Sequence, residues 1–347
     1  MKIKELFQKA VEKDASDIHL VVGVKPVLRI NGELMVLKDQ AEITNKELEN
    51  EIFSLINEDQ KKRFLSEYDL DFSYALESGE RFRVNLHYEK TNVGLVARII
   101  RDEKPGLEDI GMPEMTEDLL NANKGLILVT GPTGCGKSTT LAAMVEYINQ
   151  NRKCSIITLE DPIEFLFHPQ KSVVVQRQLG SDMNDFASGL KHVLRQDPDV
   201  VMVGEMRDLE TIATAITLAE TGHLVLATLH TYSAAQTIDR IIDIFPPHQQ
   251  NQIRSQVSNT LKAVFSQNLL SRSDKKDRVA AREVLLNNPA VANLIRENKI
   301  SQIKNTIETS REKGMRTMDS DIKRLYKEGI IEKEEARNNM VNPDSLK

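Results

Sequence analysis

The stretch Leu-Ile-Leu-Val-Thr-Gly-Pro-Thr-Gly-Cys-Gly-Lys-Ser at residues 126–138 decides the fold of this chain. Residues 131–138 have the spacing GxxxxGK[ST] of a phosphate-binding loop, and an apolar run that predicts a strand precedes them. Glycines in such a loop let backbone N–H groups turn toward phosphate oxygens. The alternative is an ordinary glycine-rich turn between a strand and a helix. The strand before the loop and the helix formers after it favour nucleotide binding.

The residues of this loop have expected parts in holding ATP and Mg²⁺. Lys137 is expected to reach the β- and γ-phosphates, and the Ser138 hydroxyl to ligate Mg²⁺. We expect Cys135 to face away from the phosphates, although an exposed thiol there could be oxidised. The predicted nucleotide-binding residues are Gly131, Pro132, Thr133, Gly134, Cys135, Gly136, Lys137, Ser138 and Thr139.

Length and composition narrow the class of protein. A chain of 347 residues suggests two domains, each large enough for its own core. The net charge of −6 argues against a general nucleic-acid binder. Two cysteines are too few for a disulfide framework or a four-cysteine zinc site. No apolar run approaches the ~20 residues of a membrane span, and the N-terminus does not resemble a signal peptide. A cytoplasmic protein that could dock onto a membrane protein is expected.

The first part of the chain, residues 1–101, is predicted to be a small α+β domain. Helical spacing predicts a helix over 3–13, and Asn31-Gly32 predicts a hairpin turn. Residues 102–115 contain two prolines and two glycines and are predicted to be a linker. The other expected elements are strands at 18–22, 27–30, 34–37, 70–76, 81–88 and 93–101, and helices at 44–56 and 58–66.

Residues 116–347 are predicted to be an α/β domain with a largely parallel sheet. From about residue 248 the chain is expected to be mostly helical, with a β-like interruption at 279–286. The expected strands before that point are 125–129, 155–159, 173–176, 200–203 and 223–228, and the expected helices are 139–150, 182–194, 209–220 and 233–243.

Acidic residues follow two of the predicted parallel strands. Glu160 and Asp161 end one strand, and Glu205 follows another after Gly204, where an aspartate is usual. Hydrolysis of a phosphoanhydride needs a metal and a carboxylate that orients or deprotonates water. We expect Glu205 to be the base or water-positioning group, and Glu160 and Asp161 to polarise water or hold Mg²⁺, with Glu205 also in the metal shell. The alternative is that these acids are solvated or cap helices.

Basic residues give two further candidates. His230 lies at the carboxyl end of another strand, where a γ-phosphate sensor would be placed, although such a histidine is often structural. The spacing between His223 and His230 makes a shared metal site unfavourable. Arg81, Arg83 and Arg98 lie in the first domain. They form either a solvated basic face or arginine fingers that reach a nucleotide, including one in a neighbouring subunit.

Taken together, these segments resemble the secretion-ATPase superfamily, most closely the PilT-type retraction ATPases of type IV pili. The matching stretches are residues 15–20 (Ala-Ser-Asp-Ile-His-Leu), the loop at 131–140, an Asp box at 157–165, an atypical Walker B at 195–208, a His box at 221–231, and residues 292–297 (Ala-Asn-Leu-Ile-Arg-Glu), which are similar to a motif linked to retraction. Val291 and Ala292 depart from the first part of that motif, and Cys135 replaces the commoner serine.

The resemblance implies an N-terminal PAS-like α+β domain and a C-terminal RecA-like ATPase domain with C-terminal helices. It implies a homohexameric ring in which ATP sits between the domains and arginines of the first domain reach the phosphates. Hydrolysis would act on an inner-membrane platform protein, at the inner face of the membrane, so that pilin subunits leave the fibre and twitching motility follows.

Other functions within the resemblance stay open. The chain has neither the tetracysteine motif nor the extra N-terminal domain usual in extension and export ATPases, which favours retraction. The alternatives are an extension or secretion ATPase and an accessory subunit that works with a paralogous retraction ATPase. A RecA-like nucleic-acid motor is disfavoured by the acidic balance and by the lack of an aromatic-basic stripe.

Overall fold

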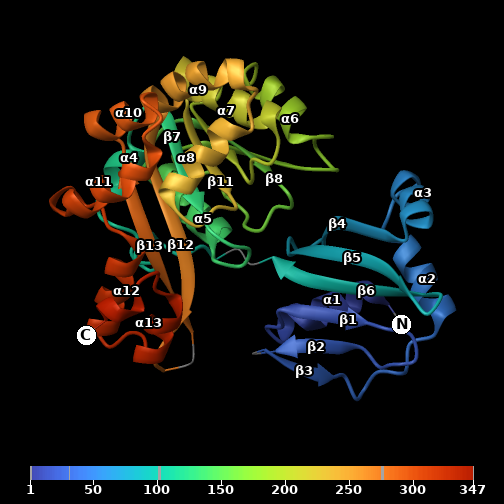
Figure 1. The fold of residues 1–347 in the computed structure, drawn as a ribbon. Helices are drawn as coiled ribbons and strands as arrows, with labels where there is room; N and C mark the ends of the chain where they lie inside the picture. Colours follow the sequence, from blue (N-terminus) through green and yellow to red (C-terminus); the bar gives the residue numbers. More distant parts are fainter. Residues whose placement is uncertain (1, 31, 101–102, 275–276, 347) are drawn as a thin grey trace. The chain divides into compact units, whose positions relative to one another are not determined.

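The computed structural model describes residues 2–30, 32–100, 103–274 and 277–346. The chain forms two compact units, with residues 1–103 and 164–166 in unit 1, and residues 104–163 and 167–347 in unit 2. The α/β class predicted from the sequence is confirmed, since each unit combines a sheet with helices (Figure 1). Asn31, half of the predicted hairpin turn, lies outside the described residues.

Unit 1 is an antiparallel sheet with the strand order β3-β2-β1-β6-β5-β4. In β5 the side chains alternate as the sequence predicts, because Phe82 and Val84 are fully buried while Arg81 and Arg83 are half-buried. Phe7 of the first helix stacks on Phe82, with ring centroids 4.4 Å apart. The elements are α1 (Ile3–Glu12), β1 (Asp17–Leu20), β2 (Val27–Ile30), β3 (Glu33–Val36), α2 (Asn45–Phe53), α3 (Glu58–Glu67), β4 (Asp69–Ala75), β5 (Arg81–Glu89) and β6 (Asn92–Ile100).

Unit 2 has a sheet with the order β13-β12-β7-β11-β10-β8-β9, in which all neighbours are parallel except β12 and β13. The carboxyl ends of β7, β11, β10 and β8 therefore meet at one edge of the sheet, where ligands bind in such folds. The elements up to the last parallel strand are α4 (Thr116–Leu120), β7 (Gly125–Thr130), α5 (Lys137–Asn151), β8 (Ser155–Glu160), β9 (Val173–Gln178), α6 (Phe186–Val193), β10 (Val200–Val203), α7 (Leu209–Thr221), β11 (Leu224–Leu229), α8 (Ala234–Asp243), α9 (Pro247–Thr260) and β12 (Leu261–Ser271).

The expectation of a mostly helical chain after residue 248 is wrong at β12. Eleven residues, Leu261–Ser271, form a strand that pairs with both β7 and β13. Because five consecutive residues of β12 are buried, 263–267, its sequence lacks the alternation that distinguishes a strand from a buried helix. The remaining elements are β13 (Arg278–Leu286), α10 (Pro289–Arg296), η1 (Ile300–Gln302), α11 (Ile303–Thr309), η2 (Arg311–Lys313), α12 (Met318–Lys327), α13 (Lys333–Asn339) and η3 (Pro343–Ser345).

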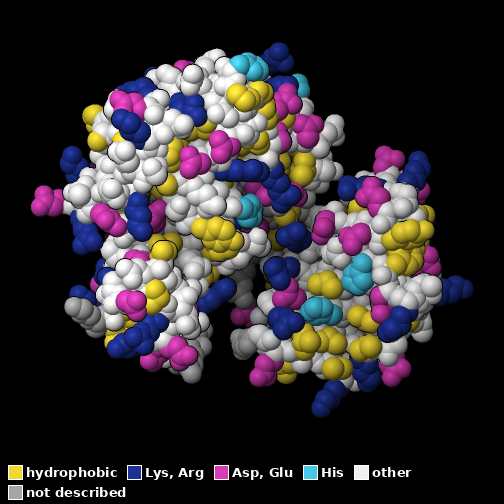
Figure 2. Space-filling model, viewed as in Figure 1, with side chains coloured by type: hydrophobic (Ala, Val, Ile, Leu, Met, Phe, Trp, Pro, Cys, Tyr) yellow, Lys and Arg dark blue, Asp and Glu magenta, His cyan; other side chains and the backbone are white. Residues whose placement is uncertain are grey.

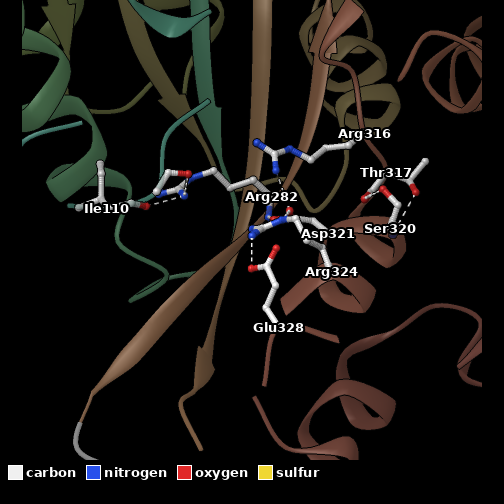
Figure 3. Close-up of polar contacts among 9 residues, drawn as sticks. Ile110, Arg282, Arg316, Thr317, Ser320, Asp321, Arg324 and Glu328 are labelled. Carbon is white, nitrogen blue, oxygen red and sulfur yellow. Dashed lines mark hydrogen bonds and ion pairs between the residues drawn. The ribbon is translucent and has the colours of Figure 1, made fainter. Parts of the chain in front are cut away.

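A buried charge cluster fixes β13 to its surroundings within unit 2 (Figure 3). Asp321 of α12, 2% exposed, accepts from Arg316 at 2.8 Å, from Arg324 at 2.9 Å and from the backbone N–H of Arg282 at 2.8 Å. The Arg282 guanidinium donates to the Ile110 carbonyl at 2.7 Å. Burial lowers the pKa of Arg282 to about 10. Part of the predicted linker is thus held against β13.

Among the residues that the structure describes, no helix has both the length and the apolar character needed to cross a bilayer.

Candidate active site

The phosphate-binding loop joins the buried strand β7 to the first turn of α5. Gly131, Gly134 and Gly136 have φ values of 144°, 77° and 87°, a region that residues with a Cβ rarely adopt. A Cβ on Gly131 would also lie 2.3 Å from the Gln267 carbonyl oxygen. Glycine is therefore required at Gly131 by both backbone conformation and space.

Lys137 begins α5 and is 9% exposed. Its Nζ donates to the carbonyl oxygens of Gly131 and Pro132, each at 2.9 Å. Ser138, the next residue, is exposed at the N-terminal end of the helix. The ammonium, the hydroxyl and the helix dipole together make this end of α5 suited to a phosphate and its cation.

Cys135 is directed into the protein rather than toward solvent. The residue is 2% exposed, and burial raises the pKa of its thiol despite the nearby Lys137 ammonium. The oxidation that an exposed thiol would allow is therefore not favoured, because the fold of the loop buries this side chain.

Glu160 is the last residue of β8 and is 6% exposed. Its Oε1 accepts from the Thr158 hydroxyl at 2.6 Å and from the Gln176 amide at 3.0 Å. These donors fix a buried carboxylate at the sheet edge that also carries the phosphate-binding loop. The adjacent Asp161 is exposed.

Packing explains the glycine that replaces the usual strand-end aspartate. The Gly204 N–H donates to the Leu159 carbonyl at 2.8 Å, and a Cβ on Gly204 would lie 3.1 Å from that oxygen. The end of β10 thus approaches the end of β8 too closely for a side chain to fit easily. The acid comes one residue later, at Glu205.

The Glu205 carboxylate lies between two basic side chains. Its Oε1 is 2.7 Å from a terminal nitrogen of Arg207, and its Oε2 is 3.4 Å from Nε2 of His230. The Glu205 side chain is 13% exposed, whereas that of Arg207 is 73% exposed. The structure therefore brings together two residues that the sequence singled out, Glu205 and His230. Sequence reasoning did not choose Arg207, because an arginine near a strand-end acid is usually solvated.

A hollow of about 770 Å³ adjoins this group. Arg207 and His230 line it together with the acidic side chains Asp239 and Asp243 of α8. Burial is the main cause that raises the pKa of Asp239, and the negative charge of the neighbouring Asp243 raises it further. The space-filling view shows acidic and basic side chains close together in the region of α8 (Figure 2).

The predicted metal ligands are Ser138, Glu160, Asp161 and Glu205. Within the described ranges, no group of three or more His, Cys, Asp or Glu side chains is arranged to hold a metal ion. His223 lies apart from His230, with its Nδ1 3.0 Å from the Leu218 carbonyl oxygen. A hydroxyl and carboxylates near a phosphate loop suit Mg²⁺, which commonly takes few protein ligands and completes its shell with phosphates and water.

The candidate arginines of unit 1 share one face of its sheet. Arg83 of β5 is directly opposite Arg98 of β6, which is directly opposite Asp17 of β1. Arg98 donates from Nε to Asp17 at 2.8 Å. Burial acts to raise the pKa of Asp17, but the hydrogen bond from Arg98 contributes to the net lowering. Arg81 precedes Arg83 by two residues on the same strand face. Their contact with a nucleotide stays a prediction.

Comparison with known proteins gives consistent matches across the chain. The family described as "Type II/IV secretion system protein" matches residues 1–339. The "Type IV pilus retractation ATPase PilT" of Pseudomonas aeruginosa is 42% identical over 346 residues, covering 100% of both chains. The "Type IV pilus ATPase PilU" of the same organism is 39% identical, covering 97% of this chain and 88% of that protein.

A solved structure extends the likeness to the fold. The crystal structure titled "Crystal Structure of the Pilus Retraction Motor PilT and Bound ADP" has a TM-score of 0.92 and 43% identity, covering 100% of this chain and 99% of that one.

Proposed function

The chain belongs to the type II/IV secretion system protein family, and from this premise we propose that it is the ATPase that powers retraction of type IV pili. That it is an ATPase follows from the family and from its similarity to retraction ATPases, one of which was crystallised with ADP. The observation that supports a role in retraction is the 42% sequence identity to the Pseudomonas retraction ATPase, which extends over the whole of both chains.

The positions of the side chains support the proposed hydrolytic roles. Lys137 holds the β- and γ-phosphates of ATP at the end of α5, and Glu205 orients the attacking water and accepts its proton. His230, 3.4 Å from Glu205, connects that carboxylate with the γ-phosphate as a sensor. Residues 131–139 supply the remaining loop contacts.

Mg²⁺ would neutralise charge that develops on the phosphates. We propose that Ser138, Glu160, Asp161 and Glu205 hold it directly or through water. The fixed orientation of the Glu160 carboxylate supports a role in this shell, because the Thr158 and Gln176 donors hold it at the sheet edge beside the loop.

We propose further that the active assembly is a homohexamer at the inner face of the inner membrane. There Arg81, Arg83 and Arg98 contact the phosphates, and hydrolysis works on the membrane platform protein so that pilin leaves the fibre. These proposals rest on the family resemblance. The position of the three arginines on one face of the sheet supports their proposed contact with phosphate.

An accessory role is a second candidate, because the chain is also similar to the Pseudomonas pilus ATPase PilU over 97% of its length. Such a subunit would hydrolyse ATP slowly alone and accelerate a paralogous ATPase. Comparing the ATP turnover of the purified chain with and without that paralogue separates the two candidates. An extension ATPase remains the third, and it predicts the opposite pilus phenotype.

The direction of force is tested by deleting the gene and counting surface pili by electron microscopy while following individual labelled pili. Retraction predicts more pili, which no longer shorten, and loss of twitching. Restoring the gene should reverse the phenotype, and restoring it with Lys137→Ala should not. Cells with fewer or no pili would contradict retraction and favour extension.

A further inference from the structure

Strand β12 continues beyond the strand that carries the phosphate-binding loop. Ser266 of β12 is directly opposite Thr130, the last residue of β7, so Gln267 lies beside the loop itself. The Gln267 carbonyl oxygen is the atom that a Cβ on Gly131 would meet at 2.3 Å. One side of the loop is therefore packed against the backbone of residue 267.

The Gln267 side chain contacts the loop at one point and the first turn of α5 at another. Its Nε2 donates to the Cys135 carbonyl at 2.7 Å, and its Oε1 accepts from the Thr140 hydroxyl at 3.0 Å. Gln267 is 2% exposed and Thr140 is 1% exposed, so water does not compete for these bonds. Because the Cys135 carbonyl can only accept, the NH₂ end of the amide must face it, and Oε1 is left to accept from the Thr140 hydroxyl.

The direction of the Cys135 carbonyl has a consequence for phosphate binding. In a trans peptide the C=O of one residue and the N–H of the next point in opposite directions. Because the Cys135 carbonyl faces Gln267, the Gly136 N–H is turned to the side of the loop away from the Gln267 side chain. Backbone N–H groups on that side are the donors that surround a bound phosphate.

We propose that Gln267 is a positioning residue of the nucleotide site. By holding the Cys135 carbonyl it turns the Gly136 N–H toward phosphate, and the Thr140 hydroxyl fixes the orientation of the Gln267 amide. The inference rests on the ATPase function and not on the pilus role. Gln267 acts without touching phosphate itself, and it reaches the loop from a distant part of the sequence because β12 runs beside β7.

The test compares ADP affinity, measured by calorimetry well below the melting temperature, in the parent chain and in matched variants. Gln267→Met keeps the approximate length of the side chain but makes neither hydrogen bond. Asn268→Ala is the control, because Asn268 is the next residue of β12 and bonds instead to Asn339 at 3.1 Å. We expect ADP affinity to fall about tenfold in Gln267→Met and to stay within about twofold of the parent in Asn268→Ala.

Thr140 provides a second pair of variants. Thr140→Val removes the hydroxyl that fixes the amide, and Thr140→Ser keeps it. We expect Thr140→Val to weaken ADP binding and Thr140→Ser to retain it. In the double variant, the effects of Gln267→Met and Thr140→Val should not add, because both act through the Gln267 amide. A purely structural role would lower the melting temperature and leave the ADP affinity of the folded protein unchanged.

Two kinds of failure are distinguishable. A parent chain that does not bind ADP would overturn the proposed ATPase function itself. A parent that binds ADP, together with a folded Gln267→Met of equal affinity, would overturn the positioning role. If Gln267→Met does not fold, Thr140→Val with unchanged affinity overturns it in the same way.

Discussion

At the scale of single residues, the Glu205 carboxylate is held between the Arg207 guanidinium and the His230 imidazole. Gly204 comes directly before Glu205, at a point where the close approach of β10 to β8 leaves little room for a side chain. Arg207 is largely exposed, so solvent screens its ion pair with the mostly buried Glu205 carboxylate.

The two cysteines should differ in reactivity. Cys135 is buried and burial raises the pKa of its thiol, so little thiolate forms at neutral pH, whereas Cys154 is partly exposed. We expect iodoacetamide at neutral pH to label Cys154 in the folded protein and both cysteines after unfolding, as read by peptide mass spectrometry. Rapid labelling of Cys135 in the folded protein would contradict the packing of the loop.

At the scale of elements, the parallel strands of unit 2 and the acids at their ends could be predicted closely from the sequence. These strands are apolar runs of four to six residues, most of them followed by Gly, Pro or an acid, and such runs favour a buried strand over a helix. Strand β12 was missed because its central residues are buried in succession and show no alternation. Gln267 could not be identified for the same reason, since its role depends on β12 passing the end of β7.

Asp321 provides a test of how α12 is attached. Replacing it by asparagine leaves the partly exposed Arg316 and Arg324 without their shared carboxylate, and losing hydrogen bonds to a charged group costs about 1.5–3 kcal/mol. We expect Asp321→Asn to lower the free energy of unfolding in urea by about that amount. The control Glu328→Gln, at an exposed ion pair with Arg324, should cost at most about 1 kcal/mol. Equal effects would contradict a structural role for the buried cluster.

Glu283 links β13 to α8 and gives a pH dependence. Its carboxylate accepts from the Ala234 N–H at 2.8 Å, and burial raises its pKa above the ordinary 4.5. The folded state then binds more protons than the unfolded state, so the free energy of unfolding decreases as pH rises from about 4.5 through the raised value. We expect Glu283→Gln to lose this decrease, so that its stability relative to the parent rises across that pH window in urea titrations. A difference independent of pH would contradict this.

At the scale of the whole molecule, the proposed motor is an assembly. If the family resemblance extends to quaternary structure, static light scattering should give about six times the subunit mass of 39.2 kDa in the presence of ATP or ADP. The two units of the chain each have a separate hydrophobic core. A monomer under every nucleotide condition would count against the motor.

We propose above all that this chain hydrolyses ATP with Glu205 at the sheet edge beside the phosphate-binding loop. The most direct measurement is steady-state ATP hydrolysis and ADP affinity of Glu205→Gln, with Glu210→Gln as the control, because Glu210 is exposed and pairs with Lys191. We predict that kcat falls at least about 100-fold in Glu205→Gln, with ADP affinity within about threefold of the parent and no change in Glu210→Gln. Hydrolysis by Glu205→Gln at the parent rate would contradict the proposed role.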